Sequence, residues 1–294
     1  MTERPAVGLI GLGLMGSALA DRLLGAGQCV IGWDIDAGRR SVLRERGGDA
    51  ARDAQDVFSR CSRVVLSLPS HREVGDVLRA AGATLGAGLT IIDTTTGDPA
   101  STEELARSMN EQGVIYLDAT ISGSSAQVRA GSGTLMVGGD AGTIAACSDI
   151  FALIGSQTFH TGRAGTGARM KLVTNLVLGL NRAALAEGLT FAEAIGLDPA
   201  LSLAVMRGSL AYSRIMDTKG ERMIYGEFAP DARLSQHLKD VRLIVGIGQH
   251  AGLPMPLSTA HRNTLEEAET AGYGELDNSA IIKVLGAASK RVRE

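Results

Sequence analysis

The chain has 294 residues, a formal net charge of −3 and a hydrophobic content of 45%. This length favours two domains, and the composition is typical of a globular chain rather than a disordered one. The sequence lacks the basic excess that nucleic-acid binding requires, and no uncharged apolar stretch reaches the ~20 residues that span a bilayer.

The cysteines and histidines argue against disulfide and metal chemistry. The three cysteines (Cys29, Cys61 and Cys147) are far apart and odd in number. This pattern fits neither a disulfide framework nor a zinc knuckle, so we expect a cytoplasmic protein. The five histidines show no metal-ligand spacing, and we expect no metal site.

The first half of the chain alternates short apolar runs with segments of helical periodicity. The predicted strands are residues 7–10, 29–33, 64–68, 89–93, 114–117, 135–137 and 158–161. The predicted helices are residues 17–25, 37–46, 72–81, 99–112 and 142–153. Apolar strands separated by helices predict a mainly parallel sheet covered on both faces. We therefore expect a doubly wound α/β Rossmann domain over residues 1–162.

The pattern changes after Gly162. Residues 167–195 show no strand pattern and no proline, and they predict one helix about 43 Å long at 1.5 Å per residue. Further helices are predicted at residues 199–208, 212–225, 234–252, 256–270 and 278–288. We expect an all-α second domain over residues 163–294, joined to the first by the long helix.

A glycine-rich turn follows the first predicted strand. Gly11, Gly13 and Gly16 form a Gly-x-Gly-x-x-Gly motif that opens a helix, and the next strand ends at Asp34. The glycines allow a tight turn, a close approach of the backbone to a pyrophosphate and close packing of the helix. Asp34 would accept hydrogen bonds from ribose hydroxyls, which favours NAD over NADP, although Arg39 and Arg40 could weaken that preference.

A loop rich in small hydroxyl residues follows the fifth strand. It runs from Asp118 through Ser122, Gly123 and Ser124, and it continues over residues 131–135. In open sheets, ligands bind at this carboxyl edge, and hydroxyl and backbone N–H groups suit a small carboxylate. An ordinary Ser/Gly loop remains an alternative for this segment taken alone.

A polar stripe runs along the long helix. Lys171 and Asn175 are four residues apart and face the same way, and Leu178 and Arg182 continue the stripe. Periodicity alone favours a solvated face. Alternatively, the stripe faces an interdomain cleft, where a partly desolvated Lys171 would have a lowered pKa and could exchange a proton with a hydroxyl or carbonyl group.

Together, these motifs resemble the β-hydroxyacid dehydrogenase family, which includes 3-hydroxyisobutyrate dehydrogenases and tartronate semialdehyde (2-hydroxy-3-oxopropionate) reductases. The resemblance covers essentially the whole chain. It rests on the opening glycine motif, the Ser122–Gly123 loop, the segment from Gly165 to Asn175, and Lys239–Asp240. Leu68–Pro69 and the turn that ends at Thr96 are similar to two further cofactor-contacting turns of the family.

The resemblance implies a reaction and a set of site residues. It implies hydride transfer between a nicotinamide cofactor and a short 3-hydroxy acid or its semialdehyde, with Lys171 as general acid/base. It implies that Ser122, Gly123, Ser124 and Asn175 bind the substrate, and that the protein forms a homodimer or homotetramer through its helical domain. The implied cofactor-binding residues are Gly11, Leu12, Gly13, Met15, Gly16, Asp34, Leu68, Pro69, Thr96 and Lys239.

The chain departs from the family pattern around the substrate. Ser124 stands where a second glycine is usual, Ala126 and Gln127 replace small residues, and Ala232 replaces a frequent aromatic residue. Ser124 and Gln127 add hydrogen-bonding capacity, so a hydroxylated substrate such as glycerate or a four-carbon sugar acid is as plausible as hydroxyisobutyrate. An imine-reducing relative and a non-catalytic nicotinamide-binding sensor remain alternatives, although Lys171 with Asn175 disfavours both.

Overall fold

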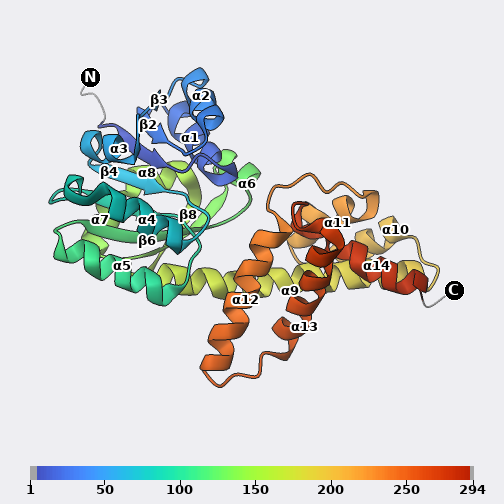
Figure 1. The fold of residues 1–294 in the computed structure, drawn as a ribbon. Coiled ribbons are helices and arrows are strands. Elements are labelled where there is room, and N and C mark those ends of the chain that lie inside the picture. Colours follow the sequence, from blue (N-terminus) through green and yellow to red (C-terminus); the bar gives the residue numbers. More distant parts are fainter. Residues whose placement is uncertain (1–4, 292–294) are drawn as a thin grey trace. The chain divides into compact units, whose positions relative to one another are not determined.

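The protein is described by a computed structural model of residues 5–291 (Figure 1). The chain divides into two compact units, of which the first ends at Lys171 and the second begins at Leu172. Within the described residues, no helix is both long and apolar enough to cross a membrane.

Unit 1 is built on an eight-stranded sheet in the order β3-β2-β1-β4-β5-β6-β7-β8. The strands are β1 (Val7–Ile10), β2 (Val30–Trp33), β3 (Asp49–Ala50), β4 (Arg63–Leu66), β5 (Thr90–Asp93), β6 (Ile115–Ser122), β7 (Gly133–Gly138) and β8 (Gly155–Gly162). Strands β1 to β6 pair in parallel, β7 is antiparallel to β6, and β8 is parallel to β7. The expected doubly wound, mainly parallel sheet is confirmed.

Helices cover both faces of this sheet. They are α1 (Leu14–Gly25), α2 (Ala37–Glu45), α3 (Ala54–Arg60), α4 (His71–Ala81), the 3₁₀ turn η1 (Gly82–Thr84), α5 (Pro99–Glu111), α6 (Ser125–Arg129), α7 (Ala141–Ala146) and α8 (Ser148–Ile154). Because side chains alternate along a strand, Leu9 packs into a core with α1 and α8, while Ile10 packs into a second core with α3, α4 and α5. Both residues are fully buried, which explains the wholly apolar sequence of β1.

Several sequence predictions in unit 1 were wrong in detail. Helix α1 begins at Leu14 rather than residue 17, because Gly13 already serves as its N-cap. The single helix expected over residues 142–153 is divided at Cys147, whose backbone leaves helical geometry between α7 and α8. Strand β3 and helices α3 and α6 were missed because they are only two to seven residues long. Asp53, which caps α3 by accepting from the Asp56 N–H at 2.7 Å, was a signal for that helix.

Unit 2 is helical, as predicted. The long helix α9 (Thr166–Ala194) has 29 residues and begins in unit 1. It is followed by α10 (Pro199–Arg207), α11 (Ile215–Tyr225), α12 (Leu234–His250), α13 (Pro256–Ala268), the π-helical turn η2 (Glu269–Tyr273), the 3₁₀ turn η3 (Asn278–Ile281) and α14 (Ile282–Arg291) (Figure 1). The core of unit 2 joins Leu189 of α9 with side chains from α10 to α13, and it includes Met216 and Met223.

Candidate functional site

The glycine-rich turn links β1 to the first turn of α1. Gly11 has a φ of +93°, and a Cβ there would lie 2.2 Å from the Ser67 carbonyl oxygen. A Cβ on Gly16 would lie 1.9 Å from the Gly11 carbonyl oxygen, so both positions require glycine. By contrast, a Cβ on Gly13 would meet only the tip of Arg39, at 3.8 Å. The turn is therefore packed tightly against neighbouring backbone at Gly11 and Gly16 and is open at Gly13, which fits a phosphate-binding turn at a helix N-terminus.

Asp34 lies just beyond β2 and fixes the shape of this turn. Its carboxylate accepts hydrogen bonds from the Leu12 N–H at 2.6 Å and from the Asp36 N–H at 2.9 Å, and the side chain is 5% exposed. The half-exposed Arg39 places Nη1 3.3 Å from the same carboxylate. A cation therefore lies beside the group that the sequence suggested as a selector against NADP.

The other predicted cofactor turns lie at the same edge of the sheet. In register, Ile10 pairs with Leu66 and Leu66 pairs with Asp93, so the segments after β1, β4 and β5 emerge together. The Leu68 N–H donates to Thr95 Oγ1 at 3.1 Å, which ties the second turn to the third. Of the other two residues predicted for these turns, Pro69 is exposed and Thr96 is half-buried.

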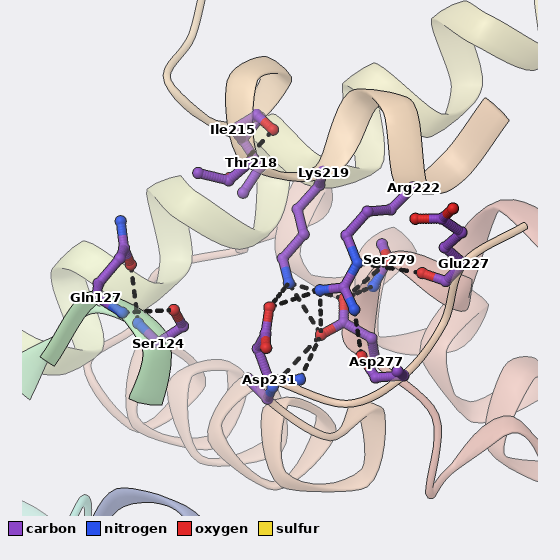
Figure 2. Close-up of polar contacts among 12 residues, drawn as sticks. Ser124, Gln127, Ile215, Thr218, Lys219, Arg222, Glu227, Asp231, Asp277 and Ser279 are labelled. Atoms are coloured by element: carbon purple, nitrogen blue, oxygen red, sulfur yellow. Dashed lines mark hydrogen bonds and ion pairs between the residues drawn. The ribbon is translucent and has the colours of Figure 1, made fainter. Parts of the chain in front are cut away.

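The predicted substrate loop begins where β6 ends. Ser122 is the last residue of that strand, and Gly123 follows with a φ of +147°. Ser124 caps the short helix α6 in a capping box: its N–H donates to Gln127 Oε1 at 2.8 Å, and the Gln127 N–H donates to Ser124 Oγ at 3.3 Å (Figure 2). Much of the hydrogen-bonding capacity expected from Ser124 and Gln127 is therefore used within the loop, which leaves the Ser124 hydroxyl hydrogen and the Gln127 amide NH₂ group.

The same strand holds the first turn of α9. Asp118 Oδ2 accepts from the Ala168 N–H at 2.8 Å, and Thr120 Oγ1 donates to the Gly167 carbonyl oxygen at 3.0 Å. A Cβ on Gly167 would lie 2.5 Å from the Asp118 carbonyl oxygen, so the helix can approach this closely only with glycine there. These contacts fix the start of the helix that carries Lys171.

Asp118 is a carboxyl group near this edge whose pKa is strongly perturbed. It is 1% exposed, and burial raises its pKa to about 6, against the opposing effect of the Ala168 and Gly165 N–H groups. The charge of Asp93 raises it further. Burial also raises the pKa of Asp93, whose carboxylate accepts a hydrogen bond from the Tyr116 hydroxyl. The sequence placed Asp118 in the substrate loop but did not predict its role at the helix N-terminus.

Lys171 and Asn175 lie one turn apart in α9. Their side chains are 8% and 6% exposed, so the solvated face that periodicity favoured is wrong for both. Asn175 Nδ2 donates to Asp240 Oδ2 at 2.9 Å, and Lys239 Nζ lies 3.7 Å from Asp240 Oδ1. Asp240 therefore fixes the orientation of the Asn175 amide, a role that the Lys239–Asp240 motif did not reveal by itself.

Two further polar residues of unit 2 are buried. Arg182, also on the stripe, is 3% exposed. His237 is 7% exposed, and its ring centroid lies 5.3 Å from that of His261. Packing of α12 and α13 against α9 buries these groups, which helical periodicity alone cannot reveal.

A buried ion cluster joins α11 to the segment before α12 and to the segment after η2. Lys219 Nζ lies 2.9 Å from the carboxylate of Asp277, which is fully buried and also accepts from Ser279 Oγ at 2.7 Å (Figure 2). Arg222 and Asp231 complete the cluster, with Nη1 2.6 Å from Oδ2. Burial acts to raise the pKa of Asp277, but the Lys219 charge and the hydrogen bonds hold it below its ordinary value. No sequence pattern indicated this cluster.

Both parts of the chain match known family models. Residues 6–162 match the NAD-binding domain of 6-phosphogluconate dehydrogenase, and residues 165–285 match the NAD-binding domain of NADP-dependent 3-hydroxyisobutyrate dehydrogenase.

Individual relatives match over nearly the full chain. The 2-(hydroxymethyl)glutarate dehydrogenase of Eubacterium barkeri is 32% identical over 97% of this chain and 96% of that protein. The L-threonate dehydrogenase of Cupriavidus necator is 30% identical over 95% of each. The crystal structure of 3-hydroxyisobutyrate dehydrogenase from Salmonella typhimurium is 25% identical, has a TM-score of 0.88, and covers 96% of this chain and 100% of that one.

Proposed function

The chain belongs to the β-hydroxyacid dehydrogenase family, and from that premise we propose that it interconverts a short 3-hydroxy acid and its semialdehyde. The relatives are dehydrogenases and reductases of hydroxy acids, which supports a nicotinamide-dependent oxidoreductase. When bound, the nicotinamide ring supplies the hydride acceptor or donor. The observation that carries the proposal is the buried Lys171, one turn before an Asn175 whose amide is fixed by Asp240.

Lys171 is the general acid/base of this reaction. In oxidation, Nζ takes the proton of the substrate hydroxyl as the carbon gives up a hydride, and in reduction the same atom returns a proton to the carbonyl oxygen. Asn175 donates to Asp240 through Nδ2, which presents its carbonyl oxygen to a substrate hydroxyl. The bonds from β6 to Gly167 and Ala168 support this role, since they fix the backbone one turn before Lys171.

The loop after β6 holds the substrate carboxylate. Ser122 supplies a hydroxyl, and Gly123 and Ser124 bring backbone at the N-terminus of α6 close to the anion. The capping box supports this assignment because it keeps the loop rigid without a bound ligand. The hydroxyl of Ser124 and the NH₂ group of Gln127 are the donors that would recognise a further oxygen on the substrate.

The substrate is a 3-hydroxy acid that carries a further hydroxyl or carboxylate group. A four-carbon sugar acid or glycerate fits the donors in the loop, and an L-threonate dehydrogenase and a 2-hydroxy-3-oxopropionate reductase are among the relatives. The relative that acts on 2-(hydroxymethyl)glutarate extends the range to a dicarboxylic hydroxy acid.

All but one of the assigned cofactor contacts belong to unit 1. Gly11, Gly13 and Gly16 form a turn that fits a dinucleotide pyrophosphate, since its front is open only at Gly13. Asp34 takes the ribose hydroxyls of NAD, with Arg39 beside it weakening discrimination against NADP. The turns at Leu68, Pro69 and Thr96 border the same edge. The remaining assigned contacts are Leu12 and Met15 of the glycine turn and Lys239 of α12.

The two domains have different roles, and the protein is a homo-oligomer in the cytoplasm. Residues 1–162 bind the dinucleotide, and residues 163–294 contribute to the substrate site and to subunit contacts. Large apolar side chains exposed on α9, α10 and α13 support a homodimer or homotetramer, among them Phe191, Leu201 and Leu257, each 63% to 68% exposed. Sedimentation equilibrium at several protein concentrations tests this, and a monomer at all of them would contradict it.

Substitution of Lys171 tests the proposed reaction. In Lys171→Met, we expect kcat for a responsive 3-hydroxy acid to fall by about 10²- to 10⁴-fold, the usual contribution of a positioned acid/base. NADH affinity, measured by fluorescence titration, should stay near the wild-type value. Lys283→Met, at an exposed lysine of unit 2, is the matched control and should keep the wild-type kcat. A Lys171→Met enzyme with near-normal turnover would remove Lys171 from the mechanism.

A further inference from the structure

Arg182 lies in the interior of unit 2 without the partners that a buried cation normally has. Its side chain is 3% exposed, and within the described residues its buried Nε and Nη1 atoms make no hydrogen bond. Burial lowers its pKa to about 10, so the guanidinium is still charged at neutral pH. An isolated buried charge is very unfavourable, so Arg182 is an anomalous group among the described residues of this unit.

The carboxylates of the buried ion cluster are already neutralised by other cations. Asp277, whose charge acts on Arg182, is bonded to Lys219, and Asp231 is bonded to Arg222. Each of these two carboxylates therefore has a cation of its own, which leaves the charge of Arg182 in excess. A single negative charge would balance it, whereas a doubly charged phosphate would exceed what the interior needs.

His261 of α13 provides a second unused group beside Arg182. It is 5% exposed, and its buried Nε2 atom has no hydrogen-bond partner among the described residues. Burial and the charge of Arg182 lower its pKa to about 4, so the imidazole is neutral and can donate one N–H. Gly179, three residues before Arg182, makes room for the rings, since a Cβ there would lie 2.7 Å from His261 Cε1 and from His237 Nε2.

We propose that Arg182 and His261 form a binding site for one carboxylate in the interior of unit 2. A guanidinium has two bidentate edges, Nε with Nη2 and Nη1 with Nη2, and each edge of Arg182 contains an unpartnered nitrogen. A carboxylate on either edge would neutralise the excess charge, and the His261 N–H could bond the same anion. The geometry and the single charge fit a carboxylate better than a phosphate.

Two sources share this chemistry. One is a free small carboxylate. The other, which rests on the proposed function, is the far carboxylate of a dicarboxylic hydroxy acid. Arg182 lies seven residues after Asn175 in the same helix, about 10 Å along its axis at 1.5 Å per residue, so the two side chains are about two turns apart on α9.

The first experiment measures the melting temperature of the protein in sodium acetate, with Arg182→Met and Arg222→Met beside the wild type. Met resembles Arg in length and carries no charge. We expect a saturable rise in Tm for the wild type. Arg182→Met should start at a higher Tm in anion-free buffer and should not respond to acetate, because it removes an unpaired buried charge. Arg222→Met, which breaks an existing ion pair, should start lower and still respond.

Two results would overturn the proposal: a wild-type Tm that does not respond to acetate, or an Arg182→Met protein that responds as the wild type does. A lower starting Tm for Arg182→Met, like that of Arg222→Met, would also count against it, since Arg182 would then have a structural partner. None of these measurements requires turnover, so they succeed or fail separately from the proposed reaction.

A kinetic comparison then identifies the source of the carboxylate. In Arg182→Met, kcat/KM is measured for a monocarboxylic and a dicarboxylic 3-hydroxy acid. A loss of about tenfold or more for the dicarboxylic acid alone would assign the site to the substrate, since a charged hydrogen bond contributes that much. An equal effect on both acids, together with a lost acetate response, would assign it to a free carboxylate.

Discussion

Replacement of Asp118 by Asn removes a buried carboxyl group whose ionisation opposes folding. The asparagine retains an oxygen that can accept from the Ala168 N–H at the start of α9, while the group that titrates with a pKa of about 6 is lost. The unfolded chain has the ordinary aspartate value of 3.8. Because the folded pKa is raised, the stability linked to Asp118 is fully present below 3.8 and is lost as the pH rises through 6.

The size of this effect follows from the two pKa values. Over the whole window, the shift of about 2 units corresponds to about 3 kcal/mol of unfolding free energy. Between pH 4.5 and pH 7, which is more accessible to experiment, linkage gives about 2 kcal/mol. The free energy of unfolding of the wild type minus that of Asp118→Asn should therefore fall by about 2 kcal/mol across this range.

Urea unfolding monitored by the fluorescence of Trp33 provides the assay. Trp33 is the single tryptophan and lies in β2, so it reports the unit that contains Asp118. Asp140→Asn is the matched control, because Asp140 is an exposed helix cap whose pKa is lowered by hydrogen bonds from Thr143. Its contribution to stability is lost only as the pH falls below 3.8, so the difference between wild type and Asp140→Asn should be nearly constant from pH 4.5 to pH 7. If the difference between wild type and Asp118→Asn is constant from pH 4.5 to pH 7, burial does not penalise the Asp118 carboxylate and the reasoning fails.

Two further substitutions test the cofactor turn and the ion cluster. In Asp34→Ser, we expect NADH affinity to fall by about tenfold or more relative to NADPH, since a charged hydrogen bond is lost. Paired fluorescence titrations measure this ratio, and an unchanged ratio would place the selector elsewhere. Lys219→Met leaves the buried Asp277 without its closest cation and should lower the free energy of unfolding by about 3 kcal/mol in urea titrations. A loss no larger than that of the exposed Lys283→Met would show that Asp277 is balanced by other groups.

The sequence predicted most of the fold because its signals are local. The strand run at residues 7–10 is wholly apolar, and the run at 64–68 contains one polar residue, Ser67, as is typical of strands buried on both faces; they appear as β1 and β4. Gly11 and Gly16 were predicted to permit a tight turn and close packing, and the backbone requires glycine at both. The short β3, α3 and α6 were missed because two to seven residues carry too little periodicity for recognition.

The surroundings of the polar groups could not be predicted in the same way. Lys171, Asn175 and Arg182 occupy one face of α9, and the spacing alone cannot distinguish a stripe exposed to water from one covered by other helices. The groups that decide the matter are Asp240, which accepts from Asn175, and His261, whose pKa is lowered by Arg182; both are more than sixty residues away in the chain.

The sequence by itself determined the order of strands and helices, the glycine turn and the residue types available for catalysis, because periodicity and backbone sterics act between near neighbours. The tertiary structure decided which charges are buried and which of them are neutralised. Three examples depend on elements that are distant in sequence. Asp118 bonds to the start of α9, and Asp277 pairs with Lys219. Arg182 has no carboxylate bonded to it among the described residues. Electrostatic energies are set by burial and by separation in space, and only the fold fixes both.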